Sequence, residues 1–303
     1  MKTASLCRSH RNKTAFRAVF ALTLVTALTF AGCGGSDEKT VTRPDPVVPP
    51  STPDHRYFAF SGYVWEARKT TQPQAAGPNY YSSDERDVWV DADKKLHMKI
   101  SRRDGKWLCS EIFSSGQFGY GTYVFRVAGR PDTLDRNAVL GFFTWDDNSF
   151  DTGALSELDI EITRWGGYLK NLHYSVQPTH GPDVEAGWYP ERSSSTFMVL
   201  LEPKSTHVIT WARSYVNFAS YLGYDIDDNL RLANWQFLSS NPARRADLAT
   251  LSTPVVIPAP SPTTTARISL WLYDDNKDGV ADPPANGTDV EVVIESFDFI
   301  PMQ

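Results

Sequence analysis

Three carboxylates occupy alternate positions near the middle of the chain, in the stretch Ser156-Glu157-Leu158-Asp159-Ile160-Glu161-Ile162-Thr163. Successive side chains of a β-strand point to opposite faces. A strand here would therefore turn its apolar residues to one face and Glu157, Asp159 and Glu161 to the other. Because neighbouring like charges disfavour ionisation, we expect at least one of the three acids to have a raised pKa. An ionised carboxylate beside a protonated one is what glycosidic bond hydrolysis requires.

A solvated strand face, paired with cations from a neighbouring strand, is the alternative interpretation, and these residues by themselves favour it. Geometry also restricts the catalytic interpretation. Cα atoms four residues apart on a strand lie about 13 Å apart, whereas a retaining glycosidase holds its two carboxyl groups about 5–5.5 Å apart. Glu157 and Glu161 would therefore have to lean toward each other over Asp159 on a twisted or curved strand.

The elements that would position these acids are short strands, because no long stretch has helical periodicity. The turn pairs Asp104-Gly105 and Gly166-Gly167 punctuate the chain, which is typical of antiparallel sandwiches and barrels. The less regular segment 225–265, with four prolines near its end, is expected to be an insertion within one domain. The predicted strands are Val88–Val90, Leu96–Arg102, Gly121–Val127, Val139–Thr144, Glu157–Thr163, Leu172–Val176, His207–Ala212, Val216–Tyr221, Arg267–Tyr273 and Glu291–Ile300.

The stretch Glu-Leu-Asp-Ile-Glu resembles the catalytic strand of glycoside hydrolase family 16. Further stretches resemble other strands of that family in the same order, from about residue 60 to the end. They are Phe118–Val127, with Val124 where the family usually has glutamate, Leu140–Trp145, His207–Trp211, Arg267–Leu272 and Val290–Pro301. The resemblance implies an all-β fold, a two-sheet antiparallel β-sandwich of the jelly-roll, concanavalin A-like type.

The same resemblance implies roles for the three acids in an endo-acting retaining hydrolase, with transglycosylation as a further activity. Glu157 would be the nucleophile, Glu161 the general acid and then base, and Asp159 the group that tunes the nucleophile. The spacing lacks an extra residue before the second glutamate. It therefore resembles lichenases and xyloglucan-active members, which favours a β-glucan among β-linked polysaccharides.

Substrate-binding roles follow for several ring side chains. Trp211 would stack on a sugar ring. Trp145 and Trp165 are expected in the cleft, with core packing as the alternative for both. His173 and Tyr174 are expected to face the cleft from the next strand, although for His173 a structural role is favoured.

The N-terminus resembles a bacterial lipoprotein signal. Residues 1–17 are basic, 18–30 are almost wholly apolar, and Ala31 and Gly32 precede Cys33. The apolar run is short for a bilayer span. We expect residues 1–33 to form a signal peptide with a lipobox and Cys33 to be lipidated; an ordinary signal peptide with a chance cysteine is the alternative. Residues 34–54 contain five prolines and predict a disordered tether, which leaves 55–303 as one domain.

Charge and cysteine usage support an exported protein. The net charge is −6. Without the five basic residues before Cys33, 25 basic residues face 36 acidic ones, so the net charge falls to −11, which disfavours nucleic acid as a partner. Only Cys109 remains in the domain, where a buried small residue is a better interpretation than a nucleophile. We expect a monomer, anchored by its lipid to the cell envelope at the outer membrane or cell surface.

The stretch Asp274-Asp275-Asn276-Lys277-Asp278-Gly279 has the spacing of a calcium loop, followed by Asp282. Ala285 stands where an EF-hand would have glutamate, and the flanks are strand-like. A polar turn is therefore favoured over a structural calcium site, and no cofactor is expected. Two other functions remain open beside the hydrolase: a non-catalytic carbohydrate-binding lipoprotein on the same fold, and a structural envelope lipoprotein.

Overall fold

The computed structural model describes residues 43, 45–147, 156–177, 179, 192–238 and 257–303. The expected signal peptide, its lipobox at Cys33 and residues 34–42 and 44 of the expected tether lie outside the described residues. The described chain from Arg43 onward belongs to one compact unit. It contains no helix with the length and apolar character needed to cross a bilayer.

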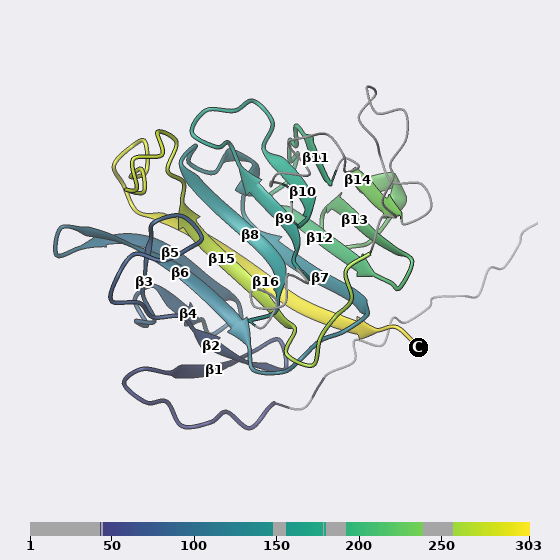
Figure 1. Cartoon of the computed structure of the whole chain (residues 1–303), viewed down its shortest axis with the longest axis horizontal. Coiled ribbons are helices and arrows are strands. Elements are labelled where there is room, and N and C mark those ends of the chain that lie inside the picture. The colour runs from purple at the N-terminus through teal and green to yellow at the C-terminus, as the bar shows by residue number, and fades with distance from the viewer. Residues whose placement is uncertain (1–42, 44, 148–155, 178, 180–191, 239–256) are drawn as a thin grey trace, which may run out of the picture. The chain divides into compact units, whose positions relative to one another are not determined.

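Strands dominate the described chain, in two antiparallel layers joined by the β5–β6 hairpin (Figure 1). The strands are β1 (Arg56–Phe60), β2 (Tyr63–Ala67), β3 (Tyr80–Tyr81), β4 (Val88–Val90), β5 (Leu96–Arg103), β6 (Lys106–Ser114), β7 (Gly121–Ala128), β8 (Ala138–Trp145), β9 (Leu158–Thr163), β10 (Leu172–Val176), β11 (Ser193–Thr196), β12 (Lys204–Trp211), β13 (Tyr215–Leu222), β14 (Arg231–Leu238), β15 (Thr265–Leu272) and β16 (Val290–Pro301). Two short 3₁₀ helices, Pro131–Thr133 and Asp228–Leu230, lie in connections.

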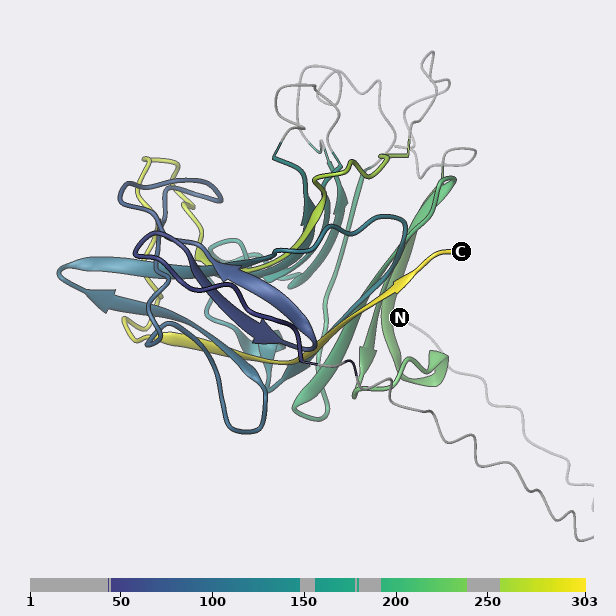
Figure 2. The ribbon, with the colours of Figure 1, turned by 90° about the horizontal axis from the view of Figure 1, so that it is seen from below.

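The first layer has the order β11-β10-β9-β8-β15-β6-β2-β1, and the second has the order β14-β13-β12-β7-β16-β5-β4. The β5–β6 hairpin extends beyond the neighbouring strand ends in two perpendicular views (Figures 1 and 2). β3 adds a short parallel pairing to β6. The all-β, two-sheet antiparallel sandwich expected from the sequence is therefore confirmed.

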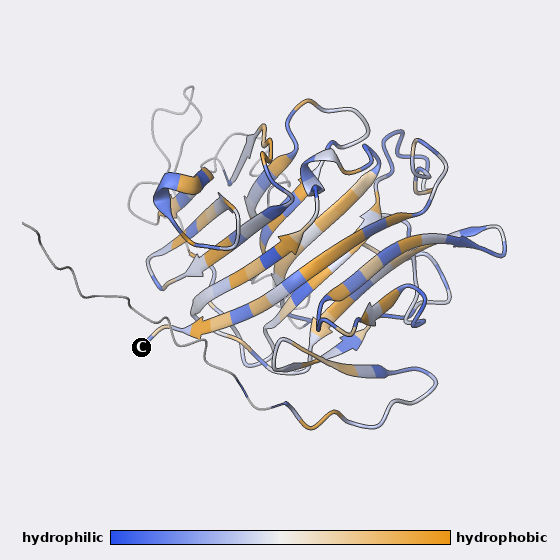
Figure 3. Ribbon diagram, turned by 180° about the vertical axis from the view of Figure 1, so that it is seen from behind, coloured by the Kyte–Doolittle hydropathy of each residue, from blue (hydrophilic) through white to orange (hydrophobic). Residues whose placement is uncertain are grey.

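Aromatic side chains pack between the two layers and form the core. Phe125 of β7 lies 4.8 Å from Phe142 of β8, between ring centroids. Trp65 of β2 lies 5.2 Å from Phe297 of β16. Apolar and polar residues alternate along many of the strands (Figure 3), so each strand has one face for this core and one face outside it.

Ten predicted strands agree with the structure to within a few residues. Within the segment 225–265, which was expected to be an insertion within the domain, Arg231–Leu238 forms β14, a strand that was not predicted, and pairs with β13 at the edge of the second layer. Edge strands have weaker alternation, since only one neighbour and a narrow strip of core constrain their side chains. The four-proline stretch lies partly outside the described residues.

Candidate active site

β9 turns its apolar residues into the core and its acids away from it. Leu158, Ile160 and Ile162 are fully buried. Asp159 and Glu161 lie on the opposite face, and Glu157 immediately precedes the strand. The alternation in the sequence thus produces the expected two-faced strand, because the core selects one register and a slip by one residue would bury the acids in it.

The strands on both sides of β9 leave room above the acids. On β8, Gly141 lies opposite Glu161 and Phe143 lies opposite Asp159. On β10, His173 lies opposite Glu161 and Ser175 opposite Asp159. Directly paired residues share a face, and the missing side chain at Gly141 leaves the space beside Glu161 open.

The three acids line one cleft with a volume of about 640 Å³. The cleft crosses the first layer from β10 to the segment that follows β2. Its volume lies in the range of ligand-binding clefts. Its lining residues are Arg68, Ala75, Ala76, Glu111, Phe113, Gly141, Phe143, Trp145, Asp147, Glu157, Asp159, Glu161, Gln177, Arg267, Ser269 and Trp271.

Burial raises the pKa of all three acids, and repulsion by neighbouring carboxylates adds to the rise for the two glutamates. Burial raises the pKa of Asp159 to about 7, against the hydrogen bonds from Gln177 and Glu157. Burial and the neighbouring Asp159 raise the pKa of Glu161 to about 8. The pKa of Glu157 is also raised, by burial first and then by Asp159 and Glu161. Since the three titrate together, they share protons at neutral pH, as general acid catalysis requires.

An ion-pair row crosses the floor of the same cleft. The buried Glu111 of β6 accepts from Arg68 at 3.1 Å on one carboxylate oxygen and from Arg267 at 3.2 Å on the other. Arg267 also pairs with Asp147 at 2.9 Å. None of these four residues was predicted from the sequence to lie in the site. Arg267 shares its alternation with Ser269 and Trp271 of a predicted strand, and Glu111 with Cys109 and Phe113, but no local pattern marks the pairing of these strands.

Among the ring side chains expected in the cleft, Trp145 lines it. Its Nε1 donates to Asp147 at 2.7 Å, and the guanidinium of Arg267 lies 5.4 Å from its ring centroid. Trp165 does not line the cleft. It packs behind Trp271, with 6.0 Å between ring centroids, so core packing, the alternative interpretation, describes it better.

The expectations for Trp211 and Tyr174 are overturned by burial. Trp211 is fully buried, and its Nε1 donates to the carbonyl of Pro258 at 2.8 Å. It lies on β12 of the second layer, whose inner face covers the core, so no sugar can stack on its ring. Tyr174 points from β10 into the core, where its hydroxyl donates to Ser220 Oγ at 2.8 Å.

His173 faces the same side as Glu161 but has structural partners. Its Nδ1 lies 2.8 Å from Ser195 Oγ and its Nε2 lies 3.2 Å from the carbonyl oxygen of Thr163. Burial lowers its pKa, so the ring is neutral at pH 7. This placement agrees with the structural role that the sequence favoured.

Two other predicted features can be placed. Cys109 is fully buried, with its Sγ 3.2 Å from Asn79 Oδ1. In the loop 274–282, Asp274 accepts from the backbone N–H of Gly279 at 2.9 Å and Asp282 from that of Asp275 at 2.8 Å. Within the described part of the chain, no three Asp, Glu, His or Cys side chains are grouped to hold a metal ion.

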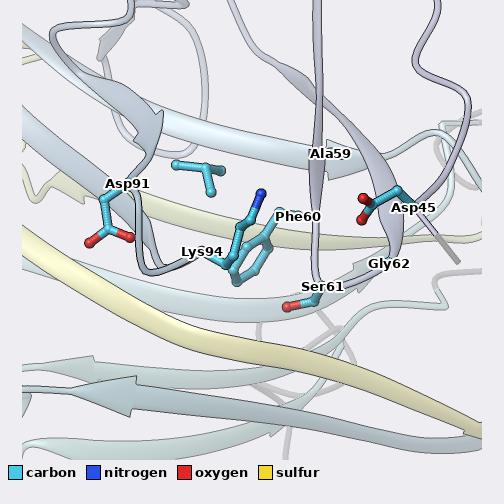
Figure 4. Close-up of a pocket in the computed structure, with 8 residues that line it drawn as sticks. Asp45, Ala59, Phe60, Ser61, Gly62, Asp91 and Lys94 are labelled. Carbon is cyan, nitrogen blue, oxygen red and sulfur yellow. The ribbon is translucent and has the colours of Figure 1, made fainter. Parts of the chain in front are cut away.

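A second cavity, of about 410 Å³, lies between the turn after β1, the turn after β4 and Asp45 (Figure 4). In this view Asp91 and Asp45 lie on opposite sides, with Lys94 and Phe60 between them. None of the residues expected in the active site is among the described residues that line it.

Comparison with known proteins finds similarity in structure only. No family model matches the sequence, and no curated protein matches it. The β-glucanase of Bacillus licheniformis superposes with a TM-score of 0.51 at 14% identity, over 84% of this chain and 100% of that chain. An immunostimulatory antigen and pseudo β-1,3-glucanase of Mycobacterium tuberculosis superposes with a TM-score of 0.54 at 15% identity, over 79% and 91%.

A third structure, the GH16 protein of the mixed linkage glucan PUL of Bacteroides ovatus in complex with a product, gives a TM-score of 0.50 at 16% identity. The match covers 82% of this chain and 98% of that chain. These matches span nearly the whole length of each solved protein. The chain therefore has the jelly-roll fold of the family 16 β-glucanases.

Proposed function

We propose that this protein is an endo-acting retaining glycoside hydrolase that cleaves a β-linked polysaccharide, with a β-glucan favoured. One observation carries the proposal: Glu157, Asp159 and Glu161 line one cleft on the same face of the first layer. A cleft lined by residues from several strands of the first layer suits a polymer that crosses the sheet, and paired carboxyl groups suit glycosidic cleavage.

The chemistry would proceed by double displacement. The Glu157 carboxylate attacks the anomeric carbon while Glu161 gives its proton to the departing glycosidic oxygen, which leaves a glycosyl ester on Glu157. The Glu161 carboxylate then takes a proton from water, and the hydroxide oxygen attacks the same carbon and releases Glu157. A sugar hydroxyl in place of water would give transglycosylation. Asp159, beside Glu157, would tune its ionisation.

The preference for a β-glucan rests on the regularity of β9. Its pairing runs without a register shift from Val139–Thr163 to Phe143–Asp159 on one side, and from Leu172–Ile162 to Val176–Leu158 on the other. The resemblance links a strand without a bulge to enzymes that act on β-1,3-1,4- or β-1,4-glucans. Two of the structural neighbours are named for β-glucan or mixed-linkage glucan.

The experiment is to incubate the full chain in detergent with a panel of β-glucans and galactans and to measure new reducing ends. Glu157→Gln is the blank. Turnover of one polysaccharide that is lost in the variant supports the hydrolase and names its substrate. NMR of the first-formed product should show a β-anomer, since two inversions retain configuration; an α-anomer would contradict the retaining mechanism.

A carbohydrate-binding protein without turnover is the second candidate. One structural neighbour is described as a pseudo β-1,3-glucanase, so the fold alone does not distinguish an enzyme from a binding protein. Affinity electrophoresis against the same panel separates the candidates. Retarded migration without new reducing ends supports the binding protein, and neither retardation nor turnover supports a structural envelope protein.

We also propose that the mature protein is a lipid-anchored monomer of the bacterial cell envelope. The proposal rests on the Ala31-Gly32-Cys33 pattern after an apolar run and on the acidic charge of the remaining chain. Incorporation of labelled fatty acid that is lost in Cys33→Ala supports the anchor; equal labelling of both chains would refute it. Membrane fractionation then locates the protein, and light scattering gives its mass in detergent.

A further inference from the structure

One edge of β16 is covered by a turn and not by a strand. β5 pairs with β16 only over Val290–Ile294, and beyond this range no strand of the described chain pairs with β16 on the side away from β7. The backbone groups there need other partners. Ser61 Oγ accepts from the N–H of Phe297 at 2.9 Å, and the hydroxyl oxygen of Tyr63 accepts from the N–H of Phe299 at 3.1 Å. The β1–β2 turn thus takes the place of a neighbouring strand.

Arg43 completes the cover of this edge. Its Nη2 donates to the carbonyl oxygen of Phe299 at 2.9 Å, and its guanidinium carbon lies 4.3 Å from the ring centroid of Tyr63. Gly62, with a φ of +75°, leaves room for this approach, because a Cβ at Gly62 would lie 2.9 Å from the Cβ of Arg43. One arginine therefore joins the chain ahead of the domain to both layers, through β2 and β16.

The chain that follows Arg43 lies on the surface of the domain. Asp45 lines the cavity of about 410 Å³ at the turn after β1 (Figure 4). Pro46 and Val48 are half-buried on either side of the exposed Val47. Proline has no backbone N–H and favours an extended backbone, so a proline-rich chain can lie along a surface with few donors left without a partner.

The same segment is fastened again where it enters β1. The N–H of Tyr57 donates to Ser51 Oγ at 3.0 Å. Lys69, just after β2, donates through its Nζ to the carbonyl oxygen of Pro53 at 2.7 Å. Contacts at both ends therefore hold residues 45–54, called the strap below, against the domain.

We infer that Arg43 is a clamp that makes the strap a fixed part of the domain and so shortens the connection to the lipid on Cys33. Arg43 is ten residues beyond Cys33, and His55 is twenty-two residues beyond it. An extended chain spans at most about 3.6 Å per residue. The clamped chain therefore reaches at most about 36 Å from the lipid, compared with about 79 Å for a tether that ends at His55.

The clamp limits how far the domain, and with it the cleft, can move from the membrane. This consequence rests on the proposed lipid anchor, whereas the clamp itself does not. Because Arg43 contacts one strand of each layer, the chain leaves the domain from a fixed point. The polysaccharide that the cleft meets is then drawn from the layer next to the anchoring membrane.

The test of the clamp compares the full lipidated chain in detergent with Arg43→Met and Arg43→Lys, after selective ¹⁵N labelling of valine. The amides of Val47 and Val48 should have order parameters of about 0.85 in the wild type, as in rigid backbone, and below about 0.6 in Arg43→Met. Methionine can still pack on Tyr63 but donates no hydrogen bond. Lysine keeps a donor for Phe299, so Arg43→Lys should lie between the two.

Arg213→Met is the matched control. The guanidinium of Arg213, in the turn between β12 and β13, lies 5.3 Å from the ring centroid of Tyr120, so its loss also removes an arginine from a tyrosine ring. Both valines should stay ordered in this variant. Unchanged order parameters in Arg43→Met overturn the clamp, and low values in the wild type overturn the strap.

The reach is measured on the lipidated chain in phospholipid vesicles. A dye on Arg102→Cys, exposed at the β5–β6 hairpin, transfers energy to a headgroup dye in the bilayer. Cys109 is buried and is not labelled. Transfer should be less efficient when Arg43→Met is added, since the released strap lets the domain move farther away. Equal transfer in the two chains overturns the shortened reach.

Each failure has its own signature. Fatty acid labelling that persists in Cys33→Ala overturns the lipid anchor, while the order parameters still test the clamp. Absence of turnover on every glycan overturns the proposed hydrolase and leaves the clamp and the reach as measured. Thermal melting of the same samples verifies that each variant is folded; if Arg43→Met does not fold, the order parameters of Arg43→Lys decide.

Discussion

Gln177 holds Asp159 through its side chain and Glu157 through its backbone. Its Nε2 donates to Oδ2 of Asp159 at 2.9 Å, and its N–H donates to the carbonyl oxygen of Glu157 at 3.0 Å. Gln177 directly follows β10, so the end of that strand fixes the position of the first two acids. Gln177 was not predicted from the sequence as a site residue.

Replacing Gln177 by methionine should impair catalysis while leaving all three acids in place. Burial raises the pKa of Asp159 and the bond from Gln177 opposes it, so its loss raises that pKa further. A hydrogen bond to a charged group is worth about 1.5–3 kcal/mol, and we expect kcat/KM to fall about 10- to 100-fold with a displaced pH profile. Gln236→Met, exposed on β14, is the matched control. Wild-type kinetics in Gln177→Met would show that the bond has no catalytic effect.

The two glutamates should differ in how their loss is rescued. Glu157→Ala and Glu161→Ala each remove one group of the double displacement, and we expect kcat to fall at least about 10³-fold. Azide restores turnover in both but with opposite product configuration, because it replaces the nucleophile in the first and the water in the second. NMR of the glycosyl azide should show an α-product with Glu157→Ala and a β-product with Glu161→Ala. A β-product with Glu157→Ala and an α-product with Glu161→Ala would exchange the roles of the two glutamates.

The acids should make the domain less stable as pH rises. A carboxyl group whose pKa is higher in the folded state binds more protons there, so its contribution to stability falls as pH rises from its unfolded pKa through its folded one. For Asp159 this range runs from about pH 4 to about pH 7. Asp159→Asn should therefore be more stable than the wild type at pH 8, by about 1–3 kcal/mol, and show little gain at pH 4.

Urea unfolding at pH 4, 6 and 8 measures this difference. Asp298→Asn is the control, since it removes a carboxylate paired with Arg126 on the second layer and should show no gain that grows with pH. A constant difference between Asp159→Asn and the wild type at all three pH values would mean that folding does not shift the pKa of Asp159.

Replacement of Trp211 should lower the stability of the domain, whereas replacement of Trp145 should weaken substrate binding. Trp211 fills the core and donates a buried hydrogen bond, so Trp211→Ala should lower the free energy of unfolding by about 3–5 kcal/mol. Trp145 lines the cleft, so Trp145→Ala should raise KM with a smaller loss of stability. Urea unfolding and steady-state kinetics on both variants provide the measurements. A larger KM effect from Trp211→Ala in folded protein would contradict the placement of its ring.

The acids of β9 and an all-β fold could be predicted from the strand patterns, and the resemblance to family 16 implied the sandwich. Glu157, Asp159 and Glu161 alternate with three apolar residues, and a strand with period two has one arrangement that buries the apolar side. Most strands were predictable for the same reason, because each carries its own pattern. The alternation of apolar and polar residues lies within each strand, so it predicts the strand even when the neighbouring strands are not known.

The cleft itself was decided by the tertiary structure. A pattern does not say which layer a strand joins. Trp211 was therefore expected to stack on a sugar ring, but its place on β12 puts it in the core. The row Arg68, Glu111, Arg267 and Asp147 comes from four segments far apart in the chain, and only strand pairing brings it together. The sequence by itself thus determined the alternating acids and the all-β class of the fold. The order of strands across the first layer determined the partners of the acids, because contacts between distant segments depend on strand pairing and not on local periodicity.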